Sequence, residues 1–446
     1  MGKVHAREAP VEQAQGRAAS GPTVRYMLAL WVPLAASIVM MVLEPSIINI
    51  GLGRTANAEL ALAAYGVAFS LALLVEAPIL MLLDASVARS NDREAFVLIR
   101  RFSLGLGLVV TAIGLVVSLT PLYDLLVIEL MNIPADVAGR ARPTLQILSF
   151  WSLPIAWRRA HQGVLIRNGR TAVITAATGV RLVTLAGALF GGLYLLPDRG
   201  AVVAGIAMDI SVFVEAGLIT IATRPVLHSE AFQARRAKAG EGLTLKALWQ
   251  FYRPLAMTTL LRQTTRPLLN TGIAAAALAR ASLAAWPVAW GLAILIAGPA
   301  WSLQQLTTAL AEDEAAYARV RRFSLTLSTL FTIVLAVVVF TPLYGEVMGS
   351  VYNLSPELQE LSRPAMQVMV ILPLIMGGQS ILRGRLIRGG CTGIVRTAMV
   401  LNVSTLAATL LLGVALTPAT GVVLAAVATL AGGLVELAWL RWKAIC

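Results

Sequence analysis

Charged residues are scarce in this chain of 446 residues. Only 13% of its residues are charged, 58% are hydrophobic, and the mean hydropathy is +0.77. Because soluble domains average about 25% charged residues, the chain has too little polar surface for a soluble globular protein. Its high apolar content also excludes a disordered chain. The composition predicts an all-α polytopic membrane protein that has the lipid bilayer as its partner.

Cysteine and histidine are also rare. The cysteines are Cys391 and Cys446, and the histidines are His5, His161 and His228, with no spacing typical of a metal site. The chain lacks the motifs H-E-x-x-H, G-x-x-x-x-G-K-[ST] and G-x-S-x-G. We therefore expect no metal, no cofactor, no ATP hydrolysis and no enzyme activity.

Long apolar segments dominate what is present. We expect a polar cytoplasmic tail over residues 1–25, followed by twelve transmembrane helices, each long enough to cross about 30 Å of hydrocarbon. The predicted spans are residues 26–50, 60–88, 97–119, 143–166, 171–196, 200–223, 248–272, 282–310, 322–345, 364–387, 393–416 and 420–440.

The formal net charge of +13 has a topological explanation. Most Lys and Arg residues fall in the tail and in alternate connections, as the positive-inside rule requires if both termini are cytoplasmic. The charge therefore does not indicate a nucleic-acid partner. It predicts a multi-pass protein of the cell (plasma or inner) membrane, which we expect to be a monomer.

The chain repeats itself at a constant offset. Residues 101–104, Arg-Phe-Ser-Leu, recur at 322–325; residues 120–123, Thr-Pro-Leu-Tyr, recur at 341–344; and residues 165–167, Leu-Ile-Arg, recur at 386–388. We expect a six-helix lobe over 26–224, a cytoplasmic linker over 225–247 and a second six-helix lobe over 248–446. An even number of spans in each half predicts a pseudo-twofold axis along the membrane normal.

A few charged side chains fall deep inside the predicted spans, where each costs roughly 3 kcal/mol or more unless it faces a cavity or a partner. Glu44 in the first span and Arg266 in the seventh lie at nearly the same depth of equivalent helices, and Arg262 shares a helical face with Arg266. We expect Glu44 and Arg266 to meet between the lobes. They form either a substrate site for an anion or a structural ion pair.

Other polar residues of the spans complete the candidate site. Asn49, Asn270 and Gln304 are predicted to bind substrate with Glu44, Arg262 and Arg266, whereas Glu76, Asp84 and Asp209 are candidates for coupling or supporting roles. Pro45, Pro78, Pro267 and Pro299 are expected to bend their helices. Structural alternatives are an association of Asp84 with Arg89, pairing of Asp209 and Glu215 with Arg181, and an interfacial Glu436 near Arg441.

Several segments resemble the progressive ankylosis protein family. Residues 64–71, Ala-Tyr-Gly-Val-Ala-Phe-Ser-Leu, resemble its A-S-Y-G-L-A-Y-S-L; Arg266-Pro267-Leu268-Leu269-Asn270 is similar to its R-P-I-V-N; Trp286-Pro287-Val288 resembles its Y-P-V-G; and His161-Gln162-Gly163-Val164-Leu165 resembles its H-A-G-I-L. The order of these segments follows the family along most of the membrane region.

That resemblance implies the fold of the multidrug/oligosaccharidyl-lipid/polysaccharide exporter superfamily, with two lobes that work by alternating access. It also implies export of anions such as pyrophosphate, ATP or citrate-like carboxylates. Arg266, Pro267, Asn270 and Asn49 match family positions. The family's other arginine of the seventh span falls on Gln263, and its glutamate of the first span is displaced by one residue from Glu44.

The sequence therefore predicts a secondary transporter that exports a small organic or phosphate-bearing anion. A proton-coupled antiporter of cationic compounds, with Glu44 as proton carrier, is an alternative, although two arginines would repel a cation. A flippase for an anionic lipid is a second alternative. A membrane-embedded enzyme or an assembly scaffold is a third, which the absence of catalytic motifs disfavours.

Overall fold

A computed structural model describes residues 22–90, 92–229, 232, 242–389 and 391–444. Almost all of these residues are helical, which confirms the expected all-α fold. The predicted tail lies almost entirely outside the described residues, as does most of the predicted linker.

The helices fall into two halves of the chain. The first half contains α2 (Val24–Leu52), α3 (Ala58–Leu80), α4 (Leu82–Arg89), α5 (Arg93–Leu119), α6 (Leu122–Asp124), η1 (Leu125–Leu130), α7 (Ala135–Leu148), η2 (Ser149–Trp151), α8 (Ser152–Arg167), α9 (Thr171–Leu195), η3 (Pro197–Arg199) and α10 (Gly200–Leu227). The second half contains α12 (Leu245–Gln263), α13 (Thr265–Ala274), α14 (Ala279–Ala297), η4 (Gly298–Ser302), α15 (Leu303–Leu310), α16 (Glu314–Phe340), α17 (Leu343–Gly345), η5 (Glu346–Val351), α18 (Pro356–Met369), α19 (Leu372–Arg388), α20 (Thr392–Leu416) and α21 (Gly421–Lys443).

Ten helical segments of the described chain are long and apolar enough to cross a membrane. Two further segments are equally long but more polar: α7 to α8, which carries Arg158 and Arg159, and α12 to α13, which carries Arg262 and Arg266. Together they make the twelve expected spans. These two spans are therefore less apolar than the other ten.

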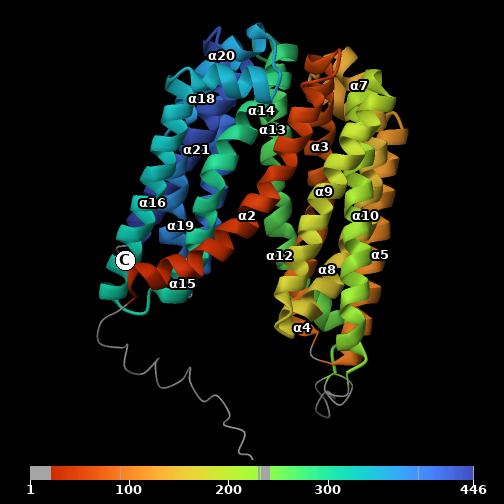
Figure 1. The fold of residues 1–446 in the computed structure, drawn as a ribbon, viewed down its shortest axis with the longest axis vertical. Coiled ribbons are helices and arrows are strands. Elements are labelled where there is room, and N and C mark those ends of the chain that lie inside the picture. The colour runs from red at the N-terminus through yellow and green to blue at the C-terminus, as the bar shows by residue number, and fades with distance from the viewer. Residues whose placement is uncertain (1–21, 91, 230–231, 233–241, 390, 445–446) are drawn as a thin grey trace, which may run out of the picture.

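The two lobes stand side by side, and the first helix of each begins against the other lobe (Figure 1). The start of α2 packs on the second lobe, where Trp31 contacts the rings of Phe323 and Phe331. Tyr252 of α12 packs in the same way on Phe102 of the first lobe. Because the offset of the repeat relates Trp31 to Tyr252 and Phe102 to Phe323, the two crossings are equivalent.

Loop geometry follows the same repeat. The hydroxyl of Tyr123 donates to the carbonyl of Ala138 at 2.6 Å, and the hydroxyl of Tyr344 donates to the carbonyl of Gln359 at 2.6 Å. The guanidinium groups of Arg142 and Arg363 stack over these two tyrosine rings. The same local fold is thus built twice, once in each half of the chain.

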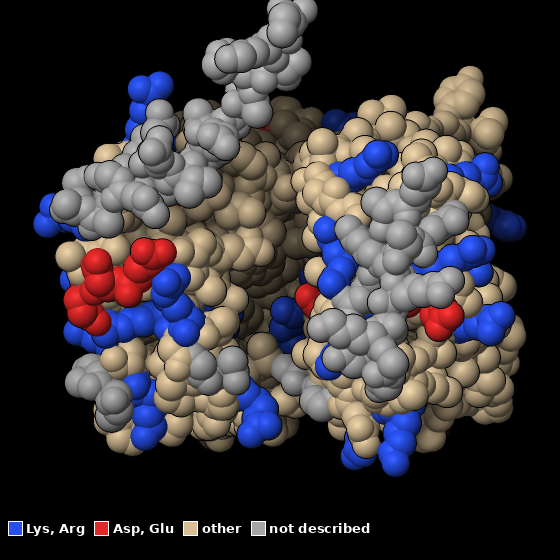
Figure 2. Space-filling model, turned by 90° about the horizontal axis from the view of Figure 1, so that it is seen from below, with Lys and Arg blue, Asp and Glu red and all other residues tan. Residues whose placement is uncertain are grey.

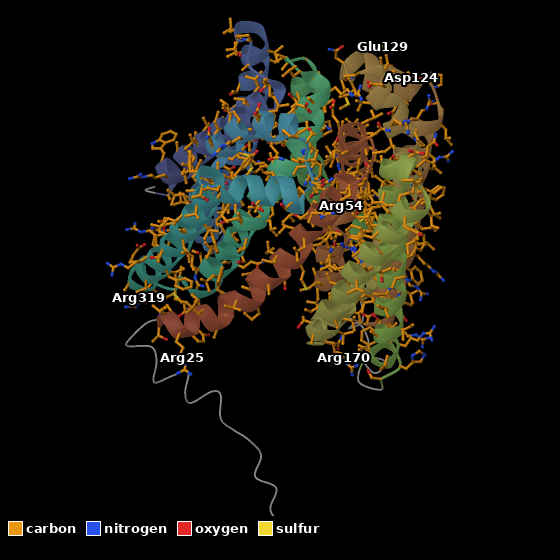
Figure 3. All side chains as sticks on the ribbon, turned by 45° about the horizontal axis from the view of Figure 1, so that its top comes forward. Arg25, Arg54, Asp124, Glu129, Arg170 and Arg319 are labelled. Carbon is orange, nitrogen blue, oxygen red and sulfur yellow. The ribbon has the colours of Figure 1, made fainter. Side chains whose placement is uncertain are left out.

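The two ends of the bundle differ in charge. Arg25, Arg170 and Arg319 lie at the end where the first described helix begins and the last one ends, whereas Asp124 and Glu129 lie at the opposite end (Figure 3). We call these the terminal end and the far end. A basic terminal end agrees with the predicted cytoplasmic termini, an orientation that stays a prediction.

The four prolines behave differently. Helix α2 continues through Pro45. Pro78 lies in the last turn of α3, directly before the break at Met81, and Pro267 lies in the first turn of α13, after the break at Thr264. Pro299 falls in the 3₁₀ segment η4. Proline has no backbone N–H to donate to the preceding turn, and three of the four lie in, or within one turn of, a local departure from the α-helix.

Candidate functional site

A deep hollow separates the two lobes at the terminal end (Figure 2). Its walls are mostly uncharged, and basic atoms are visible inside it. At the far end the lobes are joined. There Arg280 bonds to Glu59 at 3.1 Å and to Asp136 at 2.9 Å, and the side-chain amide of Asn353 donates to the carbonyl of Gly53 at 2.9 Å. The cleft therefore opens on one side of the membrane only.

A network of buried ion pairs lies inside the first lobe, beside this cleft. Arg181 on α9 donates from one nitrogen to Glu44 on α2 at 2.6 Å and from another to Glu215 on α10 at 3.3 Å. Glu215 also binds Arg158 on α8 and accepts a hydrogen bond from Thr178 at 3.1 Å. Arg181 thereby ties α2 to the interior of the first lobe.

The second lobe carries a reduced version of this network. Glu436, the repeat equivalent of Glu215, binds Arg383 on α19 and accepts from the amide of Asn402 at 2.7 Å. Asn402 is the equivalent of Arg181. The second lobe therefore has no equivalent of Arg181, the cation that binds a carboxylate on the first helix of the first lobe.

The predicted Glu44–Arg266 pair is wrong for this structure. Glu44 bonds to Arg181 and lies inside the first lobe. Glu44 lies on the face of α2 that packs against the first lobe. Equal depth along the two equivalent helices therefore does not bring it to Arg266. Glu436 was expected near Arg441 at the interface, but it is buried and binds Arg383.

Arg266 and Arg262 form no ion pair with any described residue. The guanidinium of Arg266 is half-buried and lies over the ring of Phe69, 5.6 Å from its centroid. Arg262 is exposed, and both Arg266 and Arg383 lie within electrostatic range of it. Arg262 and Arg266 of the second lobe therefore have no carboxylate partner in the described chain, whereas Arg383 is bound to Glu436.

The predicted supporting acids have different surroundings. Glu76 is buried within electrostatic range of Arg159 and Arg158, but one of its oxygens has no hydrogen-bond partner among the described residues. Asp209 does not form the predicted pair with Arg181, whereas Glu215 does. Asp84 is exposed and Arg89 stacks on Phe251, so the alternative association of Asp84 with Arg89 is not formed.

Asn49 and Asn270 join the lobes to each other. The amide of Asn49 donates to the carbonyl of Pro287 at 2.9 Å, and the amide of Asn270 donates to the hydroxyl of Ser70 at 2.8 Å. Between these bonds α3 and α14 approach closely at Gly66, where a Cβ would lie 2.8 Å from Pro287. In this conformation the two asparagines hold the interface instead of facing the cleft.

Gln304 is half-buried on α15, and its side chain makes no hydrogen bond within the described chain. No group of His, Cys, Asp and Glu able to hold a metal occurs among the described residues. Sequence reasoning missed Arg158 and the central position of Arg181. The sequence offers one indication of the role of Arg181: it lies inside a predicted span, with Asp209 and Glu215 as its possible partners.

Several solved structures have an architecture similar to that of this chain. One similar structure is the inward-facing conformation of a multidrug resistance MATE family transporter of the MOP superfamily (16% identity, 92% of this chain and 97% of the other, TM-score 0.70). Another is the lipid II flippase MurJ in an inward closed conformation (14% identity, 94% and 88%, TM-score 0.72). The chain therefore has a MATE-like fold.

A third similar structure, at 16% identity, 93% and 95% coverage and a TM-score of 0.59, is a MOP superfamily transporter from Pyrococcus furiosus, described as having a binding pocket of reverse polarity that suggests a different function. No protein-family model and no curated protein matches the sequence. The comparisons thus support the superfamily fold but not the progressive ankylosis family in particular.

Proposed function

We propose that the chain is a secondary membrane transporter of a small organic or phosphate-bearing anion. Alternating access would proceed by rocking of the two lobes about the contact between α3 and α14. With both termini in the cytoplasm, the cleft of this structure opens to the cytoplasm, the side from which an exporter loads. The MATE-like fold supports transport of some kind.

One observation carries the choice of an anion. Arg262 and Arg266 lie one helical turn apart on the helix pair that passes between the lobes, and no described carboxylate neutralises either of them. Two such cations repel each other unless an anion lies between them. A carboxylate or phosphate also fits the planar donor set of arginine, which binds oxyanions with two parallel hydrogen bonds.

Two other transport functions fit the fold. The MurJ neighbour is a lipid flippase, so an anionic lipid headgroup is an alternative ligand for the same arginines. The MATE neighbours are described as multidrug transporters, so a proton-coupled antiporter of cationic compounds, with Glu44 as the proton carrier, is a second alternative. The bond between Glu44 and Arg181 argues against that role, because a proton carrier in this position would have to compete with an arginine for its own carboxylate.

Flux into proteoliposomes tests the proposal. The assay uses citrate, pyrophosphate, ATP and a cationic dye, each with and without a pH gradient. We expect Arg266→Gln and Arg262→Gln to lower anion flux at least about tenfold, the effect of losing roughly 1.4 kcal/mol of charge-assisted binding. Arg253→Gln is the matched control, because Arg253 is exposed on α12 and faces the side of the helix opposite to Arg262.

The outcomes separate the candidate functions. Proton-driven dye exchange without anion flux would replace the anion exporter by the cation antiporter. Translocation of a fluorescent anionic lipid, with no flux of soluble anions, would replace it by the flippase. Equal anion flux in the wild type and in both arginine variants would overturn the assignment of the site.

A further inference from the structure

An apolar groove runs along the outer face of the first lobe, between α5, α8 and α10, away from the cleft. Its volume is about 560 Å³. The residues that define it are Leu104, Leu153, Trp157, Phe213, Gly217 and Ile221, and Arg224 closes its terminal end. Leu104, Phe213 and Ile221 are more than one third exposed, so the groove opens to the hydrocarbon of the bilayer.

The groove has the length of one leaflet. Phe213, Gly217 and Ile221 recur at every fourth position and form one stripe of α10, which ends near Arg224. From Phe213 to Arg224 the helix rises about 16 Å at 1.5 Å per residue, close to half of the roughly 30 Å hydrocarbon core. A single acyl chain would therefore fit with its headgroup at the basic terminal end.

Two cations stand where the headgroup would lie. Arg224 is exposed in the last turn of α10. Arg100, one turn before Leu104 on α5, has its guanidinium 5.7 Å from the ring centroid of Trp157. Trp157 is itself fixed by a hydrogen bond of 2.8 Å from its indole nitrogen to Thr220. An aromatic ring and two arginines at the membrane interface complement an anionic phosphate.

Gly217 keeps the groove open. A Cβ at this position would meet nothing within 4 Å, so the space above it belongs to the groove. In the second lobe the equivalents of Gly217, Ala216 and Trp157 are Ala438, Leu437 and Gly378. There Leu437 covers the glycine, because a Cβ on Gly378 would lie 3.0 Å from its side chain. The space that forms the groove in the first lobe is therefore filled by a leucine side chain in the second.

We propose that this groove binds one anionic glycerophospholipid, with an acyl chain against Gly217 and the phosphate between Arg100 and Arg224. The site is separate from the interlobe cleft and does not depend on the transported substrate. It would anchor the outer face of the first lobe to the leaflet at the terminal end.

Native mass spectrometry of the full chain released from detergent tests this site, with phosphatidylglycerol and phosphatidylcholine titrated as probes. We expect preferential retention of the first phosphatidylglycerol. Arg100→Gln with Arg224→Gln should weaken it about 25-fold, at roughly fivefold per arginine. Gly217→Leu should abolish this first binding step by filling the groove. Ala438→Leu and Arg321→Gln, at the equivalent positions of the second lobe, are the matched controls.

Three results would overturn the proposal. The first is equal binding of the two lipids to the wild type. The second is an equal effect of Gly217→Leu and Ala438→Leu. The third is a loss of dimer, with unchanged lipid binding, in Gly217→Leu, which would show that a second copy of the chain occupies the groove.

A second measurement needs no variant. Phosphatidylglycerol with a photoreactive acyl chain, incorporated into vesicles with the wild-type chain, should label peptides of α5, α8 and α10 preferentially. Even labelling around the first lobe would contradict a defined site.

Discussion

The two lobes share one fold but treat buried charge differently. In the first lobe Arg158, Arg181, Glu215 and Glu44 are joined in a chain of ion pairs across four helices. In the second lobe the equivalent glutamate binds one arginine and one asparagine, while Arg262 and Arg266 have no carboxylate partner among the described residues. The difference separates a lobe whose intramembrane arginines are bound to glutamates from a lobe in which two arginines have no carboxylate partner in the described chain.

The largest effect is expected at the buried glutamates. Glu215→Gln removes the carboxylate that two arginines share, and breaking a buried ion pair in this way costs about 3–5 kcal/mol. Glu436→Gln should cost less, because the side chain of Arg383 is 20% exposed and can turn toward water. Thermal unfolding of both variants in detergent, followed by tryptophan fluorescence, measures the difference. Equal losses would show that the two networks are equally structural.

Arg181→Asn gives the first lobe the residue that the second lobe has at the equivalent position, Asn402. It leaves Glu44 buried without its ion-pair partner, so we expect a loss of stability of roughly 2–3 kcal/mol, within the range for unpaired buried charges. Glu44→Gln added to Arg181→Asn should recover part of that loss, because both partners are then neutral. A double-mutant cycle on apparent Tm gives the coupling. Additive effects of the two substitutions would mean that the pair contributes no interaction energy.

The smallest effect on stability is expected at Arg266, although its substitution should strongly reduce transport. Arg266→Gln removes a cation without a carboxylate partner, and the lost stacking on Phe69 is worth about 0.5–1 kcal/mol. The relief of a desolvated charge offsets that loss, so Tm should change little in the same unfolding assay. A large drop in Tm would place Arg266 with the structural arginines of the first lobe.

The composition and the repeat were sufficient to predict the fold. A sufficiently long apolar window identifies a span without reference to any other span, and the constant offset of the repeat relates Trp31 to Tyr252 and Tyr123 to Tyr344 before any contact is known. Neither prediction requires knowledge of which side chains are in contact, which is why the structure agrees with them. The boundaries of the tail, lobes and linker, the monomeric state and the cytoplasmic termini stay predictions.

The partners of the intramembrane charges could not be predicted in the same way. The helices are apolar on nearly all sides, so hydrophobic periodicity does not show which face of α2 turns inward. Depth alone predicts Glu44 near Arg266, and of the two acids that the sequence offers as alternative partners of Arg181 only Glu215 binds it. A difference of one residue rotates a side chain by about 100°, and this rotation decides whether an arginine reaches a carboxylate.

The sequence by itself determined that this is a membrane protein, that it contains two copies of a six-span repeat, and which few charged residues fall inside the predicted spans. Only the tertiary structure decided that Arg181 binds Glu44 and Glu215, that Asn49 and Asn270 join the lobes, and that Arg262 and Arg266 have no carboxylate partner within the described chain. The physical reason is that hydropathy is a property of each segment, whereas an ion pair depends on the rotation and crossing of several helices at once.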